Sequence, residues 1–146
     1  MTEDAAGRYE FHINLDANCL VVRFFGEIEG ALFYAQFVEI TSHPDYYDGL
    51  RRIFDFRGCI LTISGSDMRN LVGKIQTDRP SPAPYKAAVI VDSLLMHGLV
   101  RTYIGLLTVP DSSYKLFNAK NGPVLGEAVD WLGLSDDFTP PAFLLN

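Results

Sequence analysis

The sequence predicts a single α/β domain, in which one mixed β-sheet is covered by helices. The chain begins with two β-type segments separated by a tight turn, and it then alternates helical and β-type segments. A hairpin followed by alternating units produces a sheet with an antiparallel start and a parallel remainder. The length of 146 residues, of which 48% are hydrophobic, is enough for one domain to bury its own core.

Five segments have the composition of β-strands. The first alternates apolar and polar residues, which is the period of a half-buried strand, and the second is almost entirely apolar. The fourth, KAAVIV, is apolar at nearly every position, as expected of a central strand buried on both faces. The strands are predicted at residues 9–15, 19–25, 50–56, 86–91 and 114–117.

Four segments carry apolar residues at helical spacing. Ser66 can cap the second helix, and Asp92 or Ser93 can cap the third. Pro123 opens the last helix and Gly133 ends it. The helices are predicted at residues 29–42, from Ser66 through Ile75, from Ser93 through Leu107, and from Gly122 to Gly133.

The predicted domain covers residues 9–133, and residues 1–8 and 134–146 are expected to be terminal tails. The Pro-rich residues 79–84 form a short connector inside the domain. The second tail contains the apolar run FLL at residues 143–145. This run either mediates self-association or docks a partner, or it folds back onto the core of its own chain, because three large apolar residues have little reason to stay in water.

The charge of the chain excludes several classes of function. Its formal net charge is −6 and its pI is about 4.9, which argues against a nucleic-acid-binding protein and against docking on anionic lipid.

The longest apolar stretch, residues 87–109, is interrupted by Asp92, His97 and Arg101, so no membrane span is expected. The acidic first residues resemble no secretion signal, which predicts a cytoplasmic protein.

Cys19 and Cys59 are far apart in the sequence and lack the spacing of a zinc site. Both are expected to be free thiols in a reducing compartment. No metal or cofactor is expected.

Asp55 and Asp92 each end a predicted strand, in the sequences IFDF and VIVD. Ligands of open α/β sheets bind beyond the carboxyl ends of parallel strands, so this pair could hold Mg²⁺ or accept a proton. The alternative is structural: Asp55 forms a turn and Asp92 caps a helix.

Two further pairs are candidate binding residues. Ser64 and Ser66 could accept a phosphoryl group at the start of a helix, where backbone N–H groups tolerate it, or they could simply cap that helix. His97 and Arg101 are four residues apart on one helix face. They could bind a carboxylate or phosphate together, or form a solvated polar face.

Four runs of residues stand in an order typical of one family: VRFFGE at 22–27, IFDFR at 53–57, AVIVD at 88–92 followed by His97-Gly98 and Arg101-Thr-Tyr103, and EAVDWL at 127–132. Over about residues 9–133, the chain resembles the STAS-like domains of the anti-sigma-factor-antagonist (SpoIIAA) type. It is most similar to the bacterial SpoIIAA-like group that is often labelled STAS/SEC14.

The resemblance implies a regulatory or binding domain rather than an enzyme. In the anti-sigma antagonists, a partner kinase phosphorylates a serine in an Asp-Ser-Ser/Thr-Gly motif after the third strand. The equivalent stretch here is LTISGSD at residues 61–67, which contains Ser64 and Ser66 but not the order of that motif. The SEC14 part of the label implies a lipid or another apolar ligand.

Three functions follow as hypotheses. The first is a non-enzymatic regulatory or protein-interaction module of STAS-like type, whose partner is another protein or a second copy of the chain. The second is a carrier or sensor of a small apolar, lipid-like ligand, which an apolar pocket lined by helix faces would favour. The third is a small enzyme that uses Asp55 and Asp92, which a cleft with convergent carboxylates would favour.

Overall fold

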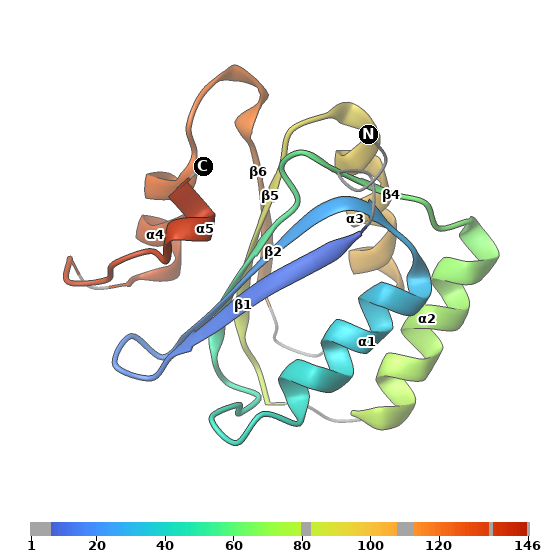
Figure 1. Cartoon of the computed structure of the whole chain (residues 1–146), viewed down its shortest axis with the longest axis horizontal. Coiled ribbons are helices and arrows are strands. Elements are labelled where there is room, and N and C mark those ends of the chain that lie inside the picture. Colours follow the sequence, from blue (N-terminus) through green and yellow to red (C-terminus); the bar gives the residue numbers. More distant parts are fainter. Residues whose placement is uncertain (1–6, 80–82, 108–112, 135, 146) are drawn as a thin grey trace.

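The computed structural model describes residues 7–79, 83–107, 113–134 and 136–145. These residues form a mixed α/β fold, as the sequence predicts, with a six-stranded sheet and five α-helices (Figure 1). Residues 1–6, 80–82, 135 and 146, which belong to the predicted tails and connector, lie outside the described part of the chain. Within that part, no helix is long and apolar enough to cross a membrane.

The strands follow the order β1-β2-β3-β5-β6, and β4 pairs with β2 beyond the end of β3. The β1–β2 pair is an antiparallel hairpin, and every other pair is parallel. β5 lies between β3 and β6, which confirms its predicted place inside the sheet. The strands are β1 (Arg8–Asn14), β2 (Cys19–Ile28), β3 (Arg51–Asp55), β4 (Cys59–Leu61), β5 (Lys86–Val91) and β6 (Ser113–Asn118).

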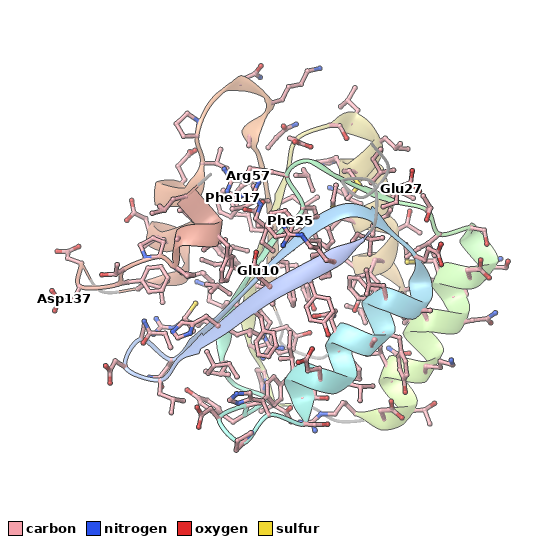
Figure 2. All side chains as sticks on the ribbon, viewed as in Figure 1. Glu10, Phe25, Glu27, Arg57, Phe117 and Asp137 are labelled. Carbon is pink, nitrogen blue, oxygen red and sulfur yellow. The ribbon has the colours of Figure 1, made fainter. Side chains whose placement is uncertain are left out.

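Helices cover both faces of this sheet (Figure 1). One face packs against α1, α2 and α3, and the opposite face packs against α4 and α5. Figure 2 shows Phe117 and Arg57 close to the α4–α5 layer. The helices are α1 (Gly30–Thr41), α2 (Gly65–Asp78), α3 (Leu94–Leu106), α4 (Leu125–Leu132) and α5 (Ala142–Leu145), with a short 3-10 turn at Ala119–Asn121.

Strand β2 shows why the central strands are almost entirely apolar. Its alternate side chains Leu20, Val22 and Phe24 belong to the core beneath α1–α3, whereas Cys19 and Val21 belong to the core beneath α4 and α5. Successive side chains of a strand point to opposite faces, so a strand covered on both faces needs apolar residues at every position.

Two elements were absent from the prediction. Strand β4 is only three residues long and lies between the strand predicted at 50–56 and the helix predicted from Ser66. Helix α5 lies in the predicted C-terminal tail, but Leu144 is 1% exposed and packs into the core beneath α4. The apolar run at residues 143–145 therefore folds back onto its own chain, although the side chain of Leu145 remains exposed.

One helix start also differs from the prediction. Helix α2 is capped by Ser64, whose hydroxyl accepts a hydrogen bond from the backbone N–H of Asp67, and not by Ser66. Gly133 ends α4 as predicted, because it adopts a left-handed φ of 72°, at which glycine is least strained.

Phe24 is the centre of the larger core. Its ring stacks on Phe56 at 4.7 Å and on Phe33 at 5.5 Å, and so joins β2 to α1 and to the end of β3. Replacement of Phe24 by Ala should lower the free energy of unfolding by about 3–5 kcal/mol, because it leaves a cavity among rigid rings. Urea denaturation measures this change. Leu15→Ala, at an exposed position in the hairpin turn, is the control and should change it by less than about 0.5 kcal/mol.

Candidate functional site

A cavity of about 100 Å³ lies between the sheet and the helices α1, α2 and α3. A single water molecule needs only about 10–15 Å³ of such space, so this cavity is large enough for an organic group. Most of its wall is apolar and comes from all three helices and from the strands beneath them. Apolar residues of the wall include Phe33, Phe56, Leu71, Ile75, Val100 and Ile104.

A second cavity of about 40 Å³ adjoins the first and reaches Thr41 at the C-terminal end of α1. The two cavities share part of their walls. The shared wall consists of Gln36, Phe37, Tyr46, Arg52 and Phe54.

The shared wall contains a buried positive charge. Arg52, on β3, is 7% exposed. Its Nε donates to the carbonyl of Leu50 at 3.0 Å, one Nη donates to the carbonyl of Asp48 at 2.6 Å, and the other donates to the hydroxyl of Tyr46 at 3.3 Å. The guanidinium also lies over the ring of Tyr85, 3.9 Å from its centroid. Within the described residues, no carboxylate forms an ion pair with Arg52.

Tyrosines gather next to this arginine. The hydroxyls of Tyr85 and Tyr114 are 2.5 Å apart and form a hydrogen bond, and both residues line the cavity together with Tyr103. Burial raises the pKa of all three hydroxyls above the ordinary value. These groups are therefore neutral hydrogen-bonding groups at physiological pH.

Gln36 is an unusual buried polar residue. It is 3% exposed, it lines both cavities, and its Oε1 has no hydrogen-bond partner among the described atoms. An unsatisfied buried acceptor costs roughly 1–3 kcal/mol and is rare in native proteins. Gln36 was not among the residues predicted from the sequence, although its position three residues after Phe33 places it on the apolar face of α1.

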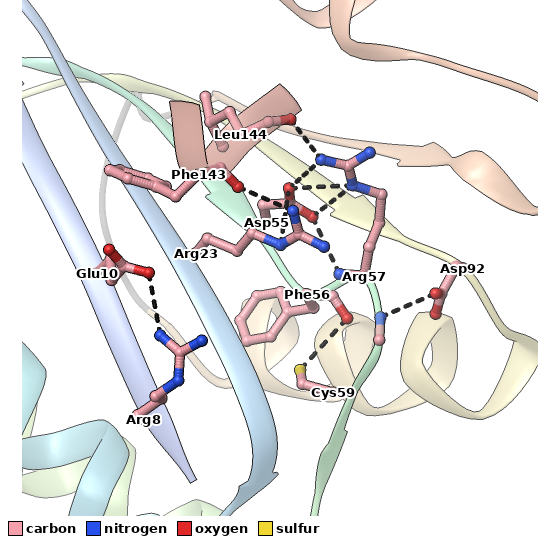
Figure 3. A network of polar contacts seen from close by, with 11 residues as sticks. Arg8, Glu10, Arg23, Asp55, Phe56, Arg57, Cys59, Asp92, Phe143 and Leu144 are labelled. Carbon is pink, nitrogen blue, oxygen red and sulfur yellow. Dashed lines mark hydrogen bonds and ion pairs between the residues drawn. The ribbon is translucent and has the colours of Figure 1, made fainter. Parts of the chain in front are cut away.

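The predicted candidate Asp55 lies outside this cavity wall, in a buried network of its own (Figure 3). Asp55 is 0% exposed. The guanidinium of Arg57 donates from Nε to both carboxylate oxygens at 3.0 Å and from Nη2 to Oδ2 at 2.6 Å. The backbone N–H of Arg57 also donates to Oδ1 at 3.0 Å, and Arg23 Nε lies 3.6 Å from Oδ2. The hydrogen bond to Asp55 raises the pKa of Arg57.

The two arginines of this network also hold the end of the chain (Figure 3). Arg23 donates to the carbonyl of Phe143 at 2.8 Å, and Arg57 donates to the carbonyl of Leu144 at 2.7 Å. Asp55 therefore serves to fix two arginines that bind helix α5 to the sheet. Its hydrogen-bonding capacity is largely used within the fold, which favours the structural interpretation of this residue.

Asp92 belongs to the same neighbourhood as Asp55, since the charges of both carboxylates act on Arg57 and on Cys59 (Figure 3). One of its carboxylate oxygens accepts the backbone N–H of Gly58 at 2.9 Å and so links the end of β5 to the turn before β4. Ser93 is the residue that caps α3, through a hydrogen bond from the N–H of Met96. Within the described residues, no group of three or more potential metal-binding side chains comes together.

The remaining candidates lie on the surface. Ser64 and Ser66 are both exposed at the start of α2, with 3.3 Å between their hydroxyl oxygens. Arg101 is exposed and His97 is partly exposed on α3, and neither lines the cavity. A joint role of His97 and Arg101 in binding an anion stays a prediction from the sequence.

Both cysteines are free and buried. Burial raises the pKa of Cys19 and of Cys59 to about 12, and for Cys59 the charges of Asp92 and Asp55 add to this increase. The thiol of Cys59 donates to the carbonyl of Phe56 at 3.3 Å. Neither thiol has the thiolate character that nucleophilic catalysis requires.

No family model matches the chain, and neither a curated protein nor a solved structure is significantly similar to it. The resemblance to STAS-like domains therefore stays a prediction from the sequence.

The Asp55 network predicts that removal of a buried ion pair lowers the free energy of unfolding much more than removal of an exposed ion pair. Asp55→Ala should lower the free energy of unfolding by roughly 3–5 kcal/mol, because it leaves two buried or half-buried guanidinium groups without their carboxylate. Chemical denaturation measures the loss. Glu10→Ala removes the exposed partner of Arg8 and should cost less than about 1 kcal/mol. Equal losses in the two variants would contradict the structural role of Asp55.

Proposed function

We propose that this domain is a non-enzymatic binding module, which holds a small apolar ligand in the cavity beneath α1, α2 and α3 as a carrier or sensor. The observation that supports this function best is the cavity itself. Protein interiors are normally packed as densely as organic crystals, with few spaces larger than a water molecule. A cavity of about 100 Å³ walled by three helix faces is therefore a feature to be explained.

The size of the cavity limits the ligand. A dry apolar cavity of about 150 Å³ is known to accept benzene. The present cavity is somewhat smaller, but the adjoining space of about 40 Å³ shares its wall. This size suits a single ring or a short alkyl chain, whereas a lipid could place only part of one acyl chain inside it.

The cavity wall supports binding rather than a reaction. The charged residues among its described lining are Asp48, Arg52 and Arg79, and Asp48 forms an ion pair with Arg79. The two cysteines lie outside the wall. Asp55 and Asp92, which an enzyme of this fold could have used, are hydrogen-bonded elsewhere.

A regulatory role is compatible with the same cavity. Ile63 and Met68 both line it, and they stand on either side of the exposed serines Ser64 and Ser66. A ligand packed against these two wall residues would stabilise the start of α2. Ligand binding could in this way be reported to a protein partner at the surface, as the resemblance to STAS-like domains implies.

Replacement of Val100 by Phe should abolish ligand binding, because the larger ring occupies the cavity from α3. The measurement is isothermal titration calorimetry with ethylbenzene as the probe. The matched control is Val38→Phe, which adds the same ring at an exposed position on α1 outside the cavity wall. Wild-type protein and the control should bind ethylbenzene with dissociation constants within about twofold of each other.

Failure of the wild-type protein to bind any probe of this size, together with no co-purified small molecule in native mass spectrometry, would contradict the proposed function. Retained binding in Val100→Phe would place the ligand elsewhere.

The sensor hypothesis predicts a local change at the start of α2. Saturation with ethylbenzene should slow backbone hydrogen exchange at residues 63–68, since the ligand packs against Ile63 and Met68. The capped start of α3 at residues 93–96 is the internal control, because Met96 does not line the cavity. Exchange that slows equally at both helix starts would indicate general stabilisation and not a signal at α2.

A further inference from the structure

We propose that the ligand of this cavity is a small apolar carboxylic acid, whose carboxylate is bound by Arg52. This inference rests on the proposed function and specifies the class of ligand. The apolar part of the acid would lie among the rings and aliphatic side chains beneath α1–α3, and its charged end would lie at the wall that the two cavities share.

The first argument is the charge of Arg52. The other arginine with comparable burial, Arg23, lies 3.6 Å from the carboxylate of Asp55, and Arg79 forms an ion pair with Asp48. Arg52 is equally buried but has no carboxylate partner among the described residues. A buried charge is normally compensated by an opposite charge. A ligand carboxylate would supply the missing anion.

The second argument is hydrogen-bonding capacity. A guanidinium carries five N–H donors, and the described structure uses three of those of Arg52, on two carbonyls and on the hydroxyl of Tyr46. The two that remain, one on each Nη, can donate to a carboxylate. The contact with the ring of Tyr85 and the three hydrogen bonds restrain the guanidinium before the ligand arrives, which lowers the entropic cost of binding.

The third argument is that other donors are available at the same wall. The hydroxyl of Tyr46 accepts from Arg52, so its own proton can be donated to a ligand. Gln36 lines both cavities, and its Oε1 has no partner. Rotation of this amide by half a turn would put its NH₂, a donor, in the place of the unpartnered Oε1.

The local charge agrees with this assignment. Among the described lining residues, Arg52 and Arg79 contribute two positive charges and Asp48 contributes one negative charge. The cavity wall therefore carries a net charge of +1 in a protein whose total is −6. In a partly enclosed apolar site, such a charge favours an anion over a neutral molecule of the same shape.

The test compares three probes on the wild-type protein by isothermal titration calorimetry at neutral pH: phenylacetate, its uncharged analogue phenylacetamide, and ethylbenzene. Phenylacetate should bind roughly 10- to 100-fold more tightly than phenylacetamide, the difference expected for a hydrogen bond to a charged group. Equal or weaker binding of phenylacetate, with measurable binding of ethylbenzene, would overturn the carboxylate assignment and leave the proposed function intact. Binding of none of the three would overturn both.

A variant of Arg52 tests whether this residue causes the preference for the carboxylate. Arg52→Met should remove the preference for phenylacetate over phenylacetamide and should retain binding of ethylbenzene within about threefold. Arg69→Met, which removes an exposed arginine of α2 outside the wall, should keep the preference and controls for net charge. A preference that survives in folded Arg52→Met would overturn the assignment. The wild-type comparison tests it independently if Arg52→Met does not fold.

Discussion

The central strands β2, β3 and β5 have helices on both faces, and this double burial constrains the rest of the molecule. Every side chain of these strands must be apolar or must find its polar partners inside the protein. Asp55 at the end of β3 meets this requirement with Arg57 and with Arg23 (Figure 3). Arg52 meets it only in part, because its donors reach carbonyls and a hydroxyl but no carboxylate.

The two helical layers fill the space against the sheet with different kinds of side chain. On one face, α4 and α5 bring a small residue, Ala128, and the compact side chain of Leu144 against the sheet, and the core closes around them. On the other face, α1–α3 meet the sheet through rings such as Phe33, Phe56 and Tyr103. Rings have few rotatable bonds and cannot fill an irregular space as adaptably as a methionine can. The unfilled space on that face is the cavity.

Local patterns explain why the fold was predictable and the cavity was not. The run KAAVIV identified β5 as an interior strand, because only a strand covered on both faces tolerates such a composition. Strand β4 is too short to show a period, and α5 is held by arginines more than 80 positions earlier in the sequence. The cavity depends on how side chains from seven elements meet, which no local window contains. A polar residue within an apolar stripe, Gln36, was the available signal.

The arginines that hold helix α5 also affect how the chain can fold during synthesis. The hydrogen bond from Arg23 to the carbonyl of Phe143 joins residues 120 positions apart. The hydrogen bond from Arg57 to the carbonyl of Leu144 likewise forms only after the C-terminal residues have been made. A growing chain therefore contains β2 and β3 long before the helices that cover one of their faces have been made. Until then, Val21 and Ile53 remain accessible to other apolar surfaces. This face of the sheet is therefore a surface that chaperones can bind, and that can aggregate, until the C-terminal helices have been made.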